Sequence, residues 1–144
     1  LWQFNLARSL TSVGAAELAL GRRADAQANE RRALTIIEPA LQKKPSDLNL
    51  RLALTDANLE LGDALAADGR VADARVAWNR AFVAIDSLAR ARGFTDHVAL
   101  RAAALARLDR LDEARPIVAE LLKRGYRRPR WTAAMRAKGL VPAS

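Results

Sequence analysis

The chain has 144 residues, enough for one domain, and its 51% hydrophobic content can supply a substantial core. It contains no cysteine, which excludes disulfides, thiol catalysis and thiolate metal sites. The formal net charge is +8, but residues 121–144 hold seven bases and no acid, so residues 1–120 are close to neutral. The sequence thus divides into a nearly neutral body and a basic tail.

Two further features concern the ends and the hydropathy of the chain. No apolar stretch approaches the roughly 20 residues that a membrane-spanning helix needs, and no basic-then-apolar leader opens the chain. The sequence begins with Leu1 and Trp2 in a helical pattern and not with methionine. We therefore expect it to be a piece of a longer protein, which leaves open a membrane segment or catalytic domain upstream.

Apolar residues recur at steps of three and four residues along the whole chain, which predicts helices throughout. The expected fold class is therefore all-α. In chain order, the predicted helices cover residues 2–20, 23–44, 47–67, 71–92, 96–108 and 112–124, with a shorter helix at about 131–138.

Individual residues predict where these helices begin and end. Gly21 and Gly69 each follow about twenty helical residues, where glycine can adopt the left-handed conformation that ends a helix. Ser46 and Thr95 are the expected caps of the third and fifth helices. Pro39 lies inside the second helix and should kink it or end it one residue earlier, since proline removes a backbone hydrogen bond.

The chain also repeats itself. Residues 21–37 and 69–85 are identical at eight of seventeen aligned positions without a gap. A fixed internal period is typical of stacked repeat proteins, in which each helical unit buries its apolar face against its neighbours. Because the connections between helices are short, the helices should form antiparallel pairs.

Small residues mark the predicted contact between the helices of each pair. The first helix carries a glycine or alanine and the second carries small residues at two points, which lets the axes approach to about 8–9 Å. In chain order these positions are Gly14, Ala26 and Ala33, then Gly62, Ala74 and Ala81, then Ala102, Ala114 and, less well matched, Leu121. With Leu61 before its glycine and Trp78 at an aromatic position, this pattern resembles the tetratricopeptide repeat (TPR) family.

The resemblance implies an α-α superhelix of three TPR-like hairpins over residues 1–125, at about 2–44, 47–92 and 96–124. Residues 126–144 would then be a basic tail or a capping helix. Two features depart from the family: Glu17 and Glu30 stand where it prefers aromatic residues, and the repeat spacings of 48 and 40 residues exceed the usual value of about 34. Another α-hairpin array is the alternative.

A narrower resemblance concerns context. Residues 34–41 and 122–129 look like parts of the C-terminal TPR segments of large bacterial signalling proteins. In those proteins a protein kinase or DNA-binding domain precedes the repeats. None of their catalytic motifs is present in this sequence, so the resemblance bears on context alone.

Candidates for chemistry are few, and we predict no enzyme activity, cofactor or metal. His97 beside Asp96 could be an oriented general base, but with no nearby nucleophile a polar residue of a first helical turn is favoured. Asp56, Glu60 and Asp63 share one helix face, and a solvated face or groove wall is favoured over a weak cation site. The indole of Trp78 and the isolated glycines are interpreted as structural.

The resemblance also implies a binding groove, because the first helix of each TPR hairpin lines the concave face. Mapped onto this sequence, the principal lining residues would be Arg8, Thr11, Leu18, Asp56, Leu59, Asp63, Asp96 and Arg107. Such a surface would suit an amphipathic or mildly basic segment. The Lys/Asn constellation with which one TPR subclass grips a carboxylate is absent at these positions. Alternatively, these residues pack against upstream repeats of the same chain.

The basic tail interleaves cations with aromatic rings. Its candidate contacts to an anion or a nucleic acid are Lys123, Arg124, Arg127, Arg128, Arg130 and Trp131. A solvated cap, with Tyr126 and Trp131 folded back over the last hydrophobic face, is favoured over nucleic-acid binding. An anionic membrane surface fits the charge equally well.

The leading functional prediction is a non-catalytic protein-interaction module, a regulatory or scaffolding part of a larger bacterial signalling protein. Its partner would be a protein or peptide segment, with nucleic acid and membrane not expected for this segment. The alternatives are a nucleic-acid-associated domain that uses the tail and a homo-oligomer formed through the first helix, with Trp2, Phe4 and Leu6 as its edge. The compartment is not determined, with cytoplasm favoured over periplasm.

Overall fold

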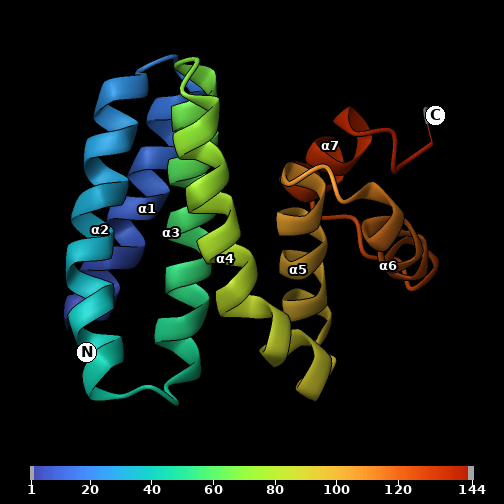
Figure 1. Cartoon of the computed structure of the whole chain (residues 1–144), viewed down its shortest axis with the longest axis horizontal. Coiled ribbons are helices and arrows are strands. Elements are labelled where there is room, and N and C mark those ends of the chain that lie inside the picture. Colours follow the sequence, from blue (N-terminus) through green and yellow to red (C-terminus); the bar gives the residue numbers. More distant parts are fainter. Residues whose placement is uncertain (1, 143–144) are drawn as a thin grey trace. The chain divides into compact units, whose positions relative to one another are not determined.

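The computed structural model describes residues 2–142, which contain seven α-helices and no β-strand (Figure 1). The helices follow one another as sequential antiparallel pairs. In chain order they are α1 (Trp2–Ala19), α2 (Arg23–Lys43), α3 (Leu48–Ala67), α4 (Val71–Arg92), α5 (Thr95–Arg107), α6 (Leu111–Lys123) and α7 (Pro129–Ala137). The all-α prediction is confirmed, and every predicted helix exists within two residues of its expected bounds.

Two expectations about helix ends are wrong. Asp47, not Ser46, caps α3, because its carboxylate accepts a hydrogen bond from the backbone N–H of Leu50 at 3.1 Å. Thr95 is the first residue of α5 and follows an N-cap position that carries no side-chain hydrogen bond. Helix α2 continues through Pro39 to Lys43, as its predicted range of residues 23–44 requires, so of the two outcomes considered for Pro39 the helix end does not occur.

The chain forms two compact units that divide between Ala84 and Ile85, within α4. The first unit contains α1, α2, α3 and the first part of α4, and the second contains the rest of α4 with α5, α6 and α7.

The core of the first unit is built from the small and aliphatic residues that the repeat pattern singled out. Ala33 and Ala74 are completely buried, and Ile37 and Leu65 lie in the same cluster of buried side chains. Gly62 and Ala81 are also buried, as predicted. The small residues therefore face the interior, where they allow close helix packing.

The three connectors within the helix pairs have the same backbone structure. Gly21, Gly69 and Asp109 lie at equivalent positions and all have positive φ, at 78°, 77° and 58°. In each connector the next residue's N–H reaches back five residues to a helical carbonyl, as Arg22 does to Glu17 at 2.8 Å. The same bond recurs in the other two, from Arg70 to Leu65 and from Arg110 to Leu105, both at 2.9 Å. This is the hydrogen bond of a Schellman helix ending.

Glycines in the first helix of two pairs each accept a large side chain from the second helix. A Cβ placed on Gly62 would lie 2.3 Å from the ring of Trp78, and a Cβ on Gly14 would lie 2.3 Å from Oε1 of Glu30. The corresponding positions of the third pair are Ala102 and Val118, both fully buried. In the third pair, alanine therefore replaces the glycine on the first helix, and valine replaces the larger glutamate or tryptophan on the second helix.

In the second unit, an ion pair connects α4 to α5. The guanidinium of Arg101 donates to Asp86 at 2.7 Å, and Arg90 donates to the same carboxylate oxygen at 3.0 Å. Burial alone would raise the pKa of Asp86, but the two arginines outweigh that effect and hold the pKa below its usual value. The carboxylate therefore stays ionised at the junction of the two helices.

Candidate interaction surface

The predicted groove residues of the first unit differ in exposure. Arg8 and Asp56 are exposed, whereas Thr11 and Leu18 are partly buried. Leu59 has only 5% of its surface exposed, so its side chain offers little surface to a partner.

Asp63, which was predicted to line the groove, accepts a hydrogen bond from Trp78. The indole N–H of Trp78 donates to Oδ1 of Asp63 at 3.0 Å. Trp78 is partly buried and packs against the core of the first unit, as its interpretation as a structural residue requires. The Asp63 carboxylate thus accepts the only hydrogen bond that the indole can donate. The rest of the indole ring packs against Gly62.

The two predicted groove residues of the second unit also have partners. Asp96 is exposed and lies 3.4 Å from the guanidinium of Arg128. Arg107 is partly buried and donates to the backbone carbonyl of Ala103 at 3.1 Å. Of these two, Asp96 is the more accessible from solvent.

Four carboxyl side chains of the first unit, which we term the Glu30 cluster, are linked by their electrostatic effect on Glu30. Its members are Glu17 on α1, Glu30 on α2, and Asp56 and Glu60 on α3. Asp56 is exposed, Glu17 and Glu60 are partly buried, and Glu30 is completely buried. The cluster therefore runs from the protein surface to its interior.

The carboxyl group of Glu30 is held without a hydrogen-bond partner among the described residues. The Thr11 hydroxyl approaches it and favours its ionised form, but the geometry falls short of a hydrogen bond. Burial and, next in effect, the charge of Glu60 raise the pKa of Glu30 to about 9, with smaller contributions from Asp56 and Glu17. Glu30 is therefore protonated and uncharged at neutral pH.

This arrangement is unfavourable for folding, because Glu30 is buried without a hydrogen-bond partner beside carboxyl groups that oppose its ionisation. The structure shows that the fold does not require it, since the equivalent place in the next hairpin holds the indole of Trp78. Perturbed carboxyl groups of this kind concentrate at functional sites.

The basic tail is folded against the second unit. The indole N–H of Trp131 donates to the backbone carbonyl of Ala99 on α5 at 2.9 Å, and the Tyr126 ring packs edge-on against that indole at 4.9 Å between ring centres. This agrees with the expectation that both aromatic residues fold back. Burial and the nearby Asp96 carboxylate raise the pKa of the Tyr126 hydroxyl.

The tail cations are exposed, and several have partners within the fold. Arg124 donates to Glu120 at 3.1 Å, and Arg127 donates to the carbonyl oxygens of Leu122 and Tyr126 at 2.9 and 3.0 Å. Lys123 and Arg130 are also exposed. The tail thus presents charge while its aromatic rings pack within the unit.

His97 is buried, with 7% of its surface exposed. Its ring is in edge contact with the Phe94 ring, with 5.3 Å between ring centres, and its Nδ1 has no hydrogen-bond partner among the described residues.

Across residues 2–142 no group of three or more histidine, aspartate or glutamate side chains has the geometry of a metal site. In the same range, every helix is too short or too polar to cross a membrane.

Comparison of the chain with protein-family models, with curated proteins and with solved structures gives no match in any of the three.

The burial of Glu30 is the feature of this surface that sequence reasoning missed. The sequence did place Glu17 and Glu30 at positions where aromatic residues are usual, and it put Asp56 and Glu60 on one helix face. Alignment of the two repeat copies also sets Glu30 against Trp78. Taken together, these signals could have placed a glutamate in a core position next to a row of acids.

Proposed function

We propose that the chain is a TPR-like array, a superhelix of three helical hairpins with a short helix after them, and that it acts as a non-catalytic protein-interaction module. The three identical connectors and the repeated close contacts at Gly14 and Gly62 support the repeat interpretation. In a larger bacterial signalling protein such a module would have a regulatory or scaffolding role.

We propose further that the module binds a basic peptide segment at the Glu30 cluster. The single observation that carries this is that three carboxyl groups, from α1 and α3, act on Glu30 of α2, which is fully buried and has no hydrogen-bond partner among the described residues. A lysine or arginine side chain of the partner would lie against the exposed Asp56 and offset the negative charge that acts on Glu30.

Fluorescence anisotropy with a labelled peptide that alternates lysine with leucine tests the proposal. Wild-type protein should bind this peptide and not a peptide in which glutamate replaces lysine, and binding should weaken as salt increases. The double charge reversal Glu17→Lys with Asp56→Lys should reduce affinity by about tenfold or more.

The matched control is Glu38→Lys, a charge reversal at an exposed position of α2 outside the cluster. It should leave binding of the lysine peptide nearly unchanged, apart from a small long-range effect at low salt. Equal losses in the control and in the cluster variant would show a nonspecific charge effect and would refute the proposed site. Undiminished binding by the cluster variant would refute it as well.

A further inference from the structure

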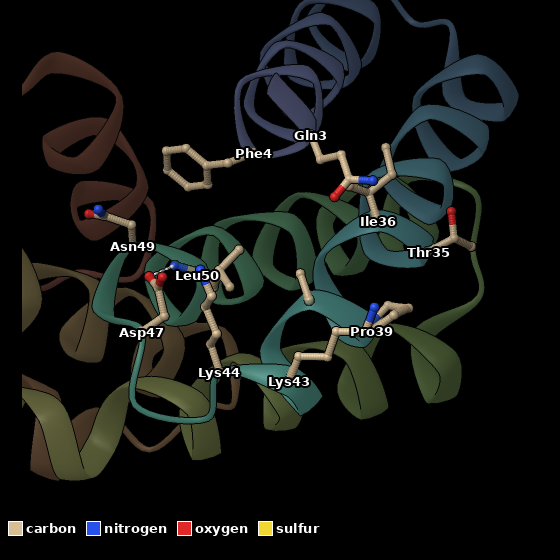
Figure 2. Close-up of a pocket in the computed structure, with 11 residues that line it drawn as sticks. Gln3, Phe4, Thr35, Ile36, Pro39, Lys43, Lys44, Asp47, Asn49 and Leu50 are labelled. Carbon is tan, nitrogen blue, oxygen red and sulfur yellow. Dashed lines mark hydrogen bonds between the residues drawn. The ribbon is translucent and has the colours of Figure 1, made fainter. Parts of the chain in front are cut away.

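The first unit contains a cavity that belongs to neither the Glu30 cluster nor the predicted groove. It has a volume of about 550 Å³ and lies where the start of α1, the last turns of α2 and the start of α3 meet (Figure 2). Small-molecule sites in proteins typically have volumes of about 300–1,000 Å³. The cavity is thus large enough for a compact organic ligand.

One part of the cavity wall is apolar. Phe4 from α1 and Ile36 from α2 are partly buried and pack against the core of the first unit, so their positions are fixed by that packing. Pro39, Ala40 and the buried Leu50 extend this part of the wall. An apolar body placed there would bury surface against side chains that are already held in place.

The polar part of the wall has an excess of positive charge. Lys43 and Lys44 at the end of α2 are both exposed, and the carboxylate of Asp47 stands opposite them at the start of α3. That carboxylate already accepts the N–H of Leu50, a bond drawn in Figure 2. Lys43 and Lys44 carry two positive charges and Asp47 carries one negative charge, so these three side chains have a net charge of +1. One anionic group on a ligand would neutralise that charge.

Thr35 is also a lining residue, and its hydroxyl donates to the carbonyl of Arg32 at 2.7 Å. The wall therefore combines apolar surface with cations.

We propose that this cavity, the α2 end pocket, binds a small amphiphilic organic anion, namely a carboxylate carrying a short acyl or aryl body. The carboxylate would lie between Lys43 and Lys44, and the body would lie against Phe4, Ile36 and Leu50. The apolar wall excludes simple inorganic anions as the preferred ligand, and the lysine pair excludes amines. The pocket is separate from the peptide site proposed above.

Titration of the whole chain with octanoate, followed by ¹⁵N–¹H spectra, tests the pocket. Octanoate should shift the amide signals of the lining residues and reach saturation. Octylamine, which has the same body with the opposite charge, and acetate, which has the charge without the body, should not. Lys43→Glu with Lys44→Glu should weaken octanoate binding by about tenfold or more, and Ala40→Trp, which fills the cavity, should abolish it.

The matched control is Arg31→Glu with Arg32→Glu, which makes the same charge change at exposed positions of α2 outside the pocket. It should leave octanoate affinity unchanged. Circular dichroism shows whether each variant is folded, and Ala40→Trp tests the site without any change of charge. Absence of saturable shifts, equal binding of octylamine, or full binding by Ala40→Trp would overturn the proposal.

Discussion

Glu30 lies against Gly14 in the first hairpin as Trp78 lies against Gly62 in the second, each at the same distance of 2.3 Å from the position of a glycine Cβ. Gly14 and Gly62 are 48 residues apart, and so are Glu30 and Trp78. The two pairs are therefore equivalent positions of one repeat. The repeat keeps the space under the glycine but fills it with different chemistry. An indole with a hydrogen-bonded N–H suits that space, whereas a carboxyl group fits only when it is protonated.

The first prediction concerns the pH dependence of stability at Glu30. Its pKa is raised from 4.5 to about 9, so between these values the folded protein holds a proton that the unfolded chain has lost. The free energy of unfolding should therefore fall as pH rises through this window. Glu30→Gln should remove this contribution and be more stable at neutral pH by roughly 1–3 kcal/mol.

Urea unfolding of both proteins across the pH range checks this, and the difference between the two curves isolates Glu30 from the other carboxyl groups. The advantage of the glutamine variant should grow as pH increases. Parallel curves for the two proteins would mean that Glu30 titrates normally in the folded state.

The second prediction compares alanine at the two equivalent glycines. At Gly62 the new methyl group meets the rigid indole of Trp78, whereas at Gly14 its closest neighbour is the flexible end of Glu30. Gly62→Ala should cost roughly 2–3 kcal/mol despite the better helix propensity of alanine. Gly14→Ala should cost less, about 1 kcal/mol or under. Thermal unfolding gives both values, and a larger loss at Gly14 would contradict the packing described.

The third prediction concerns Asp109, the non-glycine residue with positive φ in the third connector. Glycine occupies the two equivalent positions and adopts this conformation without a steric cost. Asp109→Gly should stabilise the second unit by roughly 0.5–1 kcal/mol, reduced a little by loss of the exposed ion pair with Lys138 at 2.7 Å. Lys138→Ala as a separate variant measures that loss. A destabilised glycine variant would show that the connector is held by side-chain contacts instead.

The fourth prediction separates the two residues before α3. Asp47→Ala should lower stability by about 1 kcal/mol, because the N–H of Leu50 loses its acceptor. Ser46→Ala should have an effect within about 0.5 kcal/mol, as for exposed residues without a special contact. Chemical denaturation of the two variants decides between the caps, and a greater loss at Ser46 would restore the expectation from the sequence.

Much of the fold could be predicted because the residues that set it act locally. Gly21 and Gly69 end helices through their own conformational freedom, and apolar spacing alone gives the helices and their pairing. The cap of α3 was misplaced by one residue because both Ser46 and Asp47 are good caps and only the local geometry selects one of them. The passage of α2 through Pro39 agrees with the predicted range of residues 23–44, since one lost backbone hydrogen bond does not end a long helix.

The candidate site was less predictable, because it depends on which helices meet. The sequence put Asp56, Glu60 and Asp63 on one face, but the burial of Glu30 beside them results from packing among α1, α2 and α3. The α2 end pocket has no sequence signal for the same reason, since its wall comes from three helices. Side chains that share a helix face follow from the periodicity, whereas contacts between helices follow from the tertiary structure.

If the Glu30 cluster receives a cationic partner, the ionisation of Glu30 itself responds to binding. Titration of the Glu30 carboxyl carbon by ¹³C NMR, with and without a saturating amount of the lysine–leucine peptide, measures its pKa directly. We expect a midpoint of about 9 in the free protein and a lower midpoint in the complex, because nearby cations favour the ionised carboxylate. A midpoint close to 4.5 in the free protein, or a midpoint that the bound peptide does not change, would contradict this expectation.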